Sequence, residues 1–186
     1  MSLPETFTMA DLSGKFSLNK ILTDSAAADR ILAGQGVGLL KRKAFNLVSP
    51  VMHLKHYKDA DGVESVEIEH HLHQGDSPPP ETRRMTWVEE DVDTKIFGKI
   101  KTKTRRVALT DLDDSDSFLT TGWETDCASL IQSDLYADKW TSVQVWGIEE
   151  VESGERRHTR RVKFTQTDKG GGVVHCRFVY DYLGSV

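Results

Sequence analysis

Polar side chains able to donate hydrogen bonds recur at alternate positions within apolar segments of the chain. Successive strand residues face opposite sides, so the charged neighbours mark the solvent face and these donors point inward. The inward polar set is His56, His70, Arg106, Gln144, His158, Arg160 and Tyr180. Buried polar groups without partners cost roughly 1–3 kcal/mol each, so this set either pairs internally or lines a cavity. Apolar walls with a few placed donors are typical of a small-molecule site. Taken singly, His56 or His70 also fits a satisfied interior histidine, and Arg106 or Arg160 also fits a position at the barrel rim.

The other inward positions are mostly apolar or aromatic and would form the cavity walls. Besides the predicted site residues, they are Val66, Leu72, Ile96, Gly98, Thr104, Ile148, Val162, Phe164, Cys176 and Tyr182. The segment Thr82–Glu90 is ambiguous, because Arg83, Met85 and Trp87 compete with Arg84, Thr86 and Val88 for the inner face. We predict a substrate-binding surface of Trp146, Gln144, Leu54, Met52, Ile68, His70, Ile100, Thr102, Arg160, Phe178 and Trp87.

Other site chemistries are weakly indicated. His70 faces away from His71 and His73 on a strand, so these three residues would not converge on one metal ion. The adjacent Glu149 and Glu150 fail as an acid/base pair for the same reason. The glycines at 34, 36 and 38 lack the spacing of a phosphate-binding loop, and no serine lies in a nucleophile elbow. We therefore predict no metal site and no cofactor.

A long series of strands would position these residues, with one helical stretch near its start. Lys15–Lys20 alternates as a strand, Asp24 or Ser25 can cap a helix over Ala26–Leu32, and Gly34 and Gly36 can end that helix. A second short helix follows over Val37–Asn46. Further strands are predicted at Val51–Lys58, Val63–Gln74, Thr82–Glu90, Lys95–Ala108, Phe118–Glu124, Thr141–Val151, Arg156–Thr165 and Val173–Tyr182. Residues 110–140 form an acidic insertion with a short helix over Asp126–Tyr136, which is either an elaborated loop or a lid.

Length and charge bound the class of protein. A chain of 186 residues fits one domain, residues 1–186, with a core or a barrel cavity. The net charge of −5 argues against binding of nucleic acid or of an anionic membrane surface. Without a signal-peptide pattern in Met1–Asp11 or a membrane-length apolar run, we expect a soluble, cytoplasmic protein that does not insert into membranes. Cys127 and Cys176 do not form a disulfide framework and fit a reducing compartment. The oligomeric state stays open, with a homodimer as one alternative.

The residues around the two helices resemble the fatty-acid-binding-protein family. Gly14-Lys15-Phe16 resembles its Gly-x-Trp opening, and Gly36-Val37-Gly38 before Lys41-Arg42-Lys43 resembles its Gly-Val-Gly and basic segment. The family's C-terminal Arg-x-Tyr, which grips a fatty acid carboxylate, is only approximated by Arg177-Phe178-Val179-Tyr180. The resemblance implies an all-β fold, a closed antiparallel lipocalin-like β-barrel. The two helices, residues 24–47, would form a lid between its first two strands.

Four short segments are also similar to fungal lipocalin-like domain proteins. They are Gln35-Gly36-Val37-Gly38, Ile96-Phe97-Gly98, Trp146-Gly147-Ile148-Glu149-Glu150 and Tyr180-Asp181-Tyr182-Leu183-Gly184. Some members of that group are cofactor-free hetero-Diels–Alderases that join a tropolone-type or benzopyranone-type o-quinone methide to a humulene-type terpene. The resemblance implies hydrophobic substrates of terpenoid and polyketide origin.

In such an enzyme, an inward donor would stabilise the heterodiene oxygen as it gains negative charge. The candidate catalytic donors are Arg106, His158, His56 and Tyr180. The face of Trp146 would stack on the flat heterodiene and fix the side from which the alkene approaches. The alternative function is an intracellular carrier that binds a terpenoid or fatty acid without chemistry.

Overall fold

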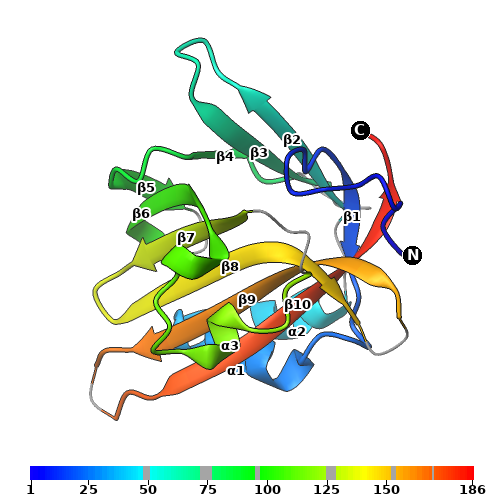
Figure 1. The fold of residues 1–186 in the computed structure, drawn as a ribbon. Coiled ribbons are helices and arrows are strands. Elements are labelled where there is room, and N and C mark those ends of the chain that lie inside the picture. Colours follow the sequence, from blue (N-terminus) through cyan, green and yellow to red (C-terminus); the bar gives the residue numbers. More distant parts are fainter. Residues whose placement is uncertain (48–50, 72–76, 95–96, 125–128, 152–153, 169) are drawn as a thin grey trace.

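A single curled sheet dominates the computed structural model, which describes residues 1–47, 51–71, 77–94, 97–124, 129–151, 154–168 and 170–186 (Figure 1). Every pairing between its strands is antiparallel. The strands are β1 (Gly14–Leu18), β2 (Val51–Lys58), β3 (Glu64–His71), β4 (Glu81–Arg84), β5 (Glu90–Thr94), β6 (Gly98–Val107), β7 (Leu130–Tyr136), β8 (Trp140–Glu150), β9 (Arg156–Gln166) and β10 (Val173–Gly184). The predicted all-β class is confirmed.

The sheet is open rather than closed. Its order is β4-β3-β2-β1-β10-β9-β8-β7-β6-β5, so the first and last strands pair at its centre and β4 and β5 are its edges. In the described residues no ladder joins these two edges, which corrects the prediction of a closed barrel. Between these two edges Trp87 has a φ of 58°, so the chain leaves the extended conformation there. The N–H of Trp87 instead donates to the carbonyl of Thr104 on β6 at 2.8 Å.

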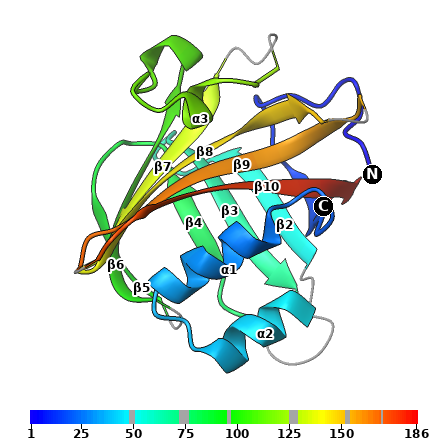
Figure 2. The ribbon, with the colours of Figure 1, turned by 90° about the horizontal axis from the view of Figure 1, so that it is seen from below.

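Two strand predictions are wrong. The segment Thr82–Glu90 is not one strand, because β4 ends at Arg84 and β5 begins at Glu90. The segment Phe118–Glu124 is not a strand either, since Asp116 caps the short helix α3 (Ser117–Thr120) by accepting from the N–H of Phe118 at 3.1 Å. This helix follows the 3-10 turn η1 (Leu109–Asp111) and lies on the outer side of the sheet (Figure 2).

The helix predicted over Asp126–Tyr136 is also wrong over its described part, which is β7. This strand pairs with β6 on one side and β8 on the other, and the hydroxyls of Ser133 and Thr104 lie 3.0 Å apart. Ladder hydrogen bonds to two neighbours outweigh a local spacing that also suits a helix. Residues 126–128 lie outside the described part of the chain.

The predicted pair of helices between the first two strands is confirmed. Helices α1 (Ser25–Gly34) and α2 (Leu39–Leu47) lie across one end of the curled sheet (Figure 2). Asp24 caps α1 by accepting from the N–H of Ala27 at 2.9 Å. Gly34 lets α1 approach the sheet closely, because a Cβ at this position would lie 2.6 Å from the ring of Phe164. Gly36, with a φ of 83°, then turns the chain toward α2.

The N-terminal segment fills the interior away from this helical pair. Leu3, Met9 and Leu12 are buried in one apolar cluster with inner residues of several strands. Those strand residues are Phe16, Met52, Leu54, Val66, Ile68, Ile131, Trp146 and Ile148. The space left for a ligand therefore lies between this cluster and α1. No helix in the described residues is long and apolar enough to cross a lipid bilayer.

Candidate functional site

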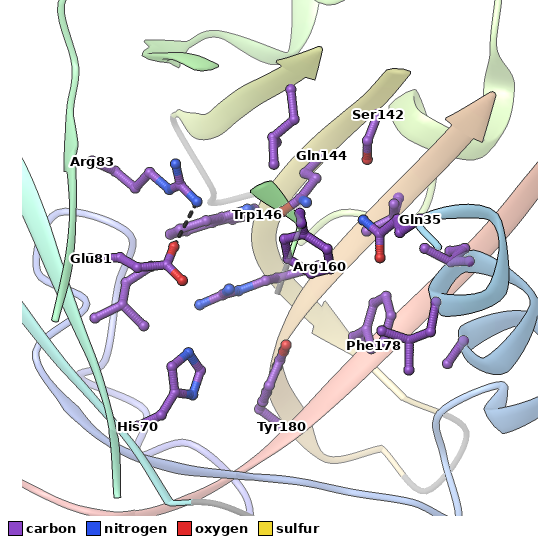
Figure 3. Close-up of a pocket in the computed structure, with 17 residues that line it drawn as sticks. Gln35, His70, Glu81, Arg83, Ser142, Gln144, Trp146, Arg160, Phe178 and Tyr180 are labelled. Atoms are coloured by element: carbon purple, nitrogen blue, oxygen red, sulfur yellow. Dashed lines mark hydrogen bonds and ion pairs between the residues drawn. The ribbon is translucent and has the colours of Figure 1, made fainter. Parts of the chain in front are cut away.

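A cavity of about 250 Å³ lies between α1 and the inner faces of the strands on both walls (Figure 3). Strands β3 and β4 form one wall, and β7 to β10 form the other. The lining residues are Ala28, Ile31, Leu32, Gln35, Ile68, His70, Glu81, Arg83, Phe97, Leu135, Ser142, Gln144, Trp146, Arg160, Val162, Phe178 and Tyr180. About half of these residues are apolar or aromatic, and the polar ones lie on both walls, so the cavity combines apolar surface with polar groups, as small-molecule sites do.

Arg160 is the polar centre of the cavity. On β9 it lies directly opposite Trp146 of β8 and Phe178 of β10 in the strand register. Its guanidinium carbon lies 3.9 Å from the centre of the Trp146 ring and 5.3 Å from that of Tyr180, so the cation rests on aromatic faces. Its Nη2 lies 3.2 Å from the sulfur of Met52. Its Nε is buried and has no hydrogen-bond partner in the described protein.

No described carboxylate lies within 4.0 Å of the Arg160 guanidinium. The nearby Glu81 pairs instead with Arg83, whose Nη2 lies 2.7 Å from the carboxylate. Burial, followed by the charge of Arg160, lowers the pKa of His70 and keeps its imidazole neutral at neutral pH. The guanidinium groups of Arg83 and Arg160 and the carboxylate of Glu81 together leave the cavity with one excess positive charge. An uncompensated buried cation is costly, so the cavity favours a ligand with an anionic or electron-rich oxygen.

Further polar atoms of the lining lack partners. Ser142 Oγ, Trp146 Nε1 and Arg83 Nε are buried without a hydrogen bond to any described protein group. Such atoms are rare in folded proteins, and each costs roughly 1–3 kcal/mol unless water or a ligand satisfies it. Together with Arg160 Nε they leave several polar atoms of the cavity wall without a hydrogen bond in the described protein.

Behind the lining, His158 supports Tyr180. The two rings are stacked, with centroids 5.3 Å apart and an angle of 24° between their planes. His158 Nδ1 lies 3.1 Å from the carbonyl of Gly147, which can only accept, so the proton is on Nδ1 and the lone pair on Nε2. Burial, followed by the charge of Arg160, lowers the pKa of His158 to about 3. This neutral histidine has no N–H left for a ligand, and it can position the Tyr180 ring.

His56 and Arg106 lie in a separate network with Glu64. The N–H of Leu12 donates to His56 Nδ1 at 3.1 Å, so Nε2 carries the proton and donates to Glu64 Oε1 at 2.8 Å. Arg106 Nε lies 2.9 and 3.0 Å from the two oxygens of the same carboxylate, and its Nη2 donates to the carbonyl of Met9 at 3.0 Å. These contacts tie the N-terminal segment to β2, β3 and β6. The structure therefore places both predicted donors outside the cavity lining.

The structure brings part of the predicted binding surface together. The members that line the cavity are Trp146, Gln144, Ile68, His70, Arg160 and Phe178, joined by Tyr180 from the predicted donors. Met52, Leu54, Ile100 and Thr102 are buried but do not line it. Trp87 lies on the outer face, with Lys103 Nζ 4.4 Å and Arg105 Cζ 4.3 Å from its ring centre. Leu72 and Ile96, which were also predicted to face inward, lie outside the described residues.

Several lining residues were not predicted. Arg83 was one of two alternatives on an ambiguous strand, and its place opposite Val66 of β3 decides between them. Its neighbour Arg84 points outward, where Nε donates to Asp59 at 2.9 Å. Ser142 follows from extending the alternation of Gln144 and Trp146 by one step along β8. The contributions of α1, such as Gln35, could not be found from strand alternation.

Comparisons with known proteins support this architecture. No protein-family model matches the chain. The chain is 29% identical over 184 residues to the "Probable pericyclase scpY" of Mollisia scopiformis, covering 97% of this chain and 94% of that protein. It is also 29% identical over 188 aligned positions to the "Pericyclase pydY" of Acremonium sp, covering 99% and 98%. The chain resembles pericyclases over nearly its whole length.

A solved structure gives the same fold. "Human cRBP IV" superposes with a TM-score of 0.51 at 15% identity, covering 92% of this chain and 97% of that chain. At this identity the likeness concerns the fold alone, a curled antiparallel sheet with a helical pair between its first two strands. The resemblance to lipocalin-like and fatty-acid-binding-protein-like barrels is confirmed. The fold, the cavity and the relatives fit either a pericyclase or a barrel that binds a small hydrophobic ligand.

Proposed function

We propose that the chain is a cofactor-free pericyclase that catalyses an intermolecular hetero-Diels–Alder reaction in the cavity around Arg160. The observation that carries the proposal is a guanidinium without a carboxylate partner, resting on Trp146 inside an apolar cavity. Support also comes from the two relatives named as pericyclases. The proposed substrates, implied by the resemblance, are a tropolone-type o-quinone methide and a humulene-type terpene.

The proposed mechanism assigns transition-state stabilisation to Arg160. As the two new bonds form, the heterodiene accepts electron density and its carbonyl oxygen becomes more negative. A guanidinium donor binds that oxygen more tightly in the transition state than in the ground state, and only such a difference raises the rate. The Tyr180 hydroxyl, carried on a ring 5.3 Å from the Arg160 guanidinium carbon, is the second donor candidate.

Confinement supplies the remainder of the rate enhancement. Holding two reactants in one apolar cavity replaces a bimolecular encounter, and proximity of this kind contributes several kcal/mol. The cavity volume of about 250 Å³ lies below the ~300–1,000 Å³ usual for ligand pockets, so the proposal requires the cavity to widen when two substrates bind. Within the proposal, Trp146 holds the Arg160 guanidinium on its ring face beside the heterodiene, which replaces the predicted stacking of that ring on the substrate. Arg106, His56 and His158 support the protein around the site.

The decisive test measures catalysis separately from binding. The o-quinone methide is generated in buffer from a stable precursor, humulene is added, and the adduct is quantified by chiral chromatography with and without the protein. The proposal expects faster adduct formation and one dominant stereoisomer, and it expects Trp146→Ala to weaken substrate binding and stereoselectivity together. A Trp123→Ala variant is the matched control, since Trp123 packs on the outer face with Leu119 and Val145. Saturable binding of humulene with no acceleration would instead identify a carrier.

A further inference from the structure

Two histidines and a glutamate meet on the outer face of the sheet, away from the cavity. His53 of β2 lies opposite Glu69 of β3 in the strand register, and His71 is the next outward residue on β3. Their ligand-capable atoms all lie within 4.8 Å of one another. The imidazole centroids of His53 and His71 are 3.9 Å apart, with 31° between the ring planes.

Pairing between two strands creates this group. Along one strand His70 and His71 face opposite sides, which excludes convergence of consecutive histidines. The neighbouring strand supplies the missing imidazole, because diagonal cross-strand side chains lie within reach of each other. His70, which lines the cavity, points to the opposite side from this outer group.

The contacts within the group show which atoms would hold the ion. His71 Nε2 lies 3.0 Å from Glu69 Oε2, so one proton now bridges the atoms that would share a metal. Moving that proton to Nδ1 frees the Nε2 lone pair, and the ion then takes the place of the proton. The second carboxylate oxygen, Oε1, remains with Lys55 Nζ at 2.5 Å and orients the ligand. The side chain of His71 is 48% exposed, which leaves room for the small rotations and for a water ligand.

From this geometry we propose that His53, His71 and Glu69 form a surface site for a divalent transition metal, with Zn²⁺ as the first candidate. Two histidines and one carboxylate form a ligand set that Zn²⁺ uses in proteins, with a fourth position left for water. The imidazoles select against Mg²⁺ and Ca²⁺, which take oxygen ligands. The ion would link β2 to β3 on the outer side of the wall that carries Ile68 and His70.

The test is zinc titration of the tag-free protein by calorimetry, after treatment with a chelator and its removal. We expect one Zn²⁺ per chain, a rise in melting temperature with Zn²⁺, and visible absorption bands when Co²⁺ is the probe. His53→Gln and His71→Gln should each weaken binding at least tenfold and remove the thermal shift.

The matched control is His175→Gln on β10. This histidine is exposed to a similar degree, 39%, but its Nε2 lies 2.9 Å from a different carboxylate, Asp116. We expect this variant to bind Zn²⁺ as the unmodified protein does. Absence of stoichiometric Zn²⁺ binding by the folded protein, or equal Zn²⁺ affinity in all three variants, would overturn the proposal.

Discussion

Replacing Arg160 by methionine separates a catalytic from a structural role for this residue. Methionine matches the length of the side chain and remains apolar between Trp146 and Met52. If Arg160 stabilises the heterodiene oxygen, its loss removes one donor from the transition state. Removal of one such donor costs about 2.7–4 kcal/mol, which is a 10²–10³-fold fall in rate. The affinity for the neutral terpene should change little.

The same change should not destabilise the fold. It loses the cation–π contact, worth at most about 2 kcal/mol at a desolvated site. It also removes a cation that has no described carboxylate partner, and burying an ion costs several kcal/mol. Part of the guanidinium surface faces the cavity, where water screens it, so we set the net gain at about 1 kcal/mol. For a chain of this size, that gain raises the melting temperature by roughly 2–4 °C.

Arg161→Met is the matched control on the neighbouring position. Arg161 points outward, and its Nε lies 2.6 Å from Glu149, a carboxylate that is 1% exposed. Breaking a buried pair costs roughly 3–5 kcal/mol, and the lower end applies because Thr159 and Arg177 still contact Glu149. This variant should therefore lose stability and keep its rate per folded molecule.

The assays are adduct formation over background, thermal unfolding, and titration with the apolar anion 1-anilinonaphthalene-8-sulfonate. A charged hydrogen bond contributes about 1.5–3 kcal/mol, so Arg160→Met should bind this anion about 10–150-fold more weakly. An Arg160→Met variant that is destabilised like Arg161→Met and retains its rate would refute the argument. Arg160 would then be a structural residue.

Three further predictions concern the lid, the N-terminal segment and the interior. Gly34→Ala should lower stability by about 1–3 kcal/mol in thermal unfolding, because the added Cβ overlaps the ring of Phe164; Gly38→Ala, with open space around it, is the control and should cost less. Arg106→Ala should lower stability by about 3 kcal/mol and spare the rate. The hydrogen bonds from Arg106, followed by those from His56, hold the pKa of Glu64 below its usual value of 4.5, so stability from Glu64 is present above pH 4.5 and is lost as the pH falls through the folded-state value. In urea titrations, the free energies of unfolding of the unmodified protein and of Arg106→Ala should therefore converge as the pH falls. A constant difference between the two free energies down to pH 2 would contradict this reasoning. Because the pKa of His158 falls from 6.5 to about 3 on folding, the unfolded chain binds more protons between these values and stability rises with pH there; His158→Phe should flatten that slope, and an unchanged slope would disprove the assignment.

Alternation along the chain determined much of the cavity wall. Charged residues on one face of β9 and β10 sent Arg160 and Tyr180 to the other face, and the alternation of Gln144, Trp146 and Ile148 gave the inner face of β8. Trp146, Arg160 and Tyr180 all line the cavity. A period-2 pattern fixes the face of each residue, because shifting a strand by one residue would expose its whole apolar face to solvent. The two helices between the first strands were equally readable, because the Asp24 cap and the turn at Gly36 act through neighbouring residues.

Only the tertiary structure decided which inward groups face a ligand. His56, Arg106 and His158 point inward as alternation requires, yet pairing and the N-terminal segment supply partners from distant parts of the chain, such as Glu64 and Gly147. The strand at residues 130–136 was likewise decided by the hydrogen bonds of β6 and β8 rather than by its own spacing. Alternation gives the face of a strand on which a side chain lies, and contacts between segments far apart in sequence decide what that face meets.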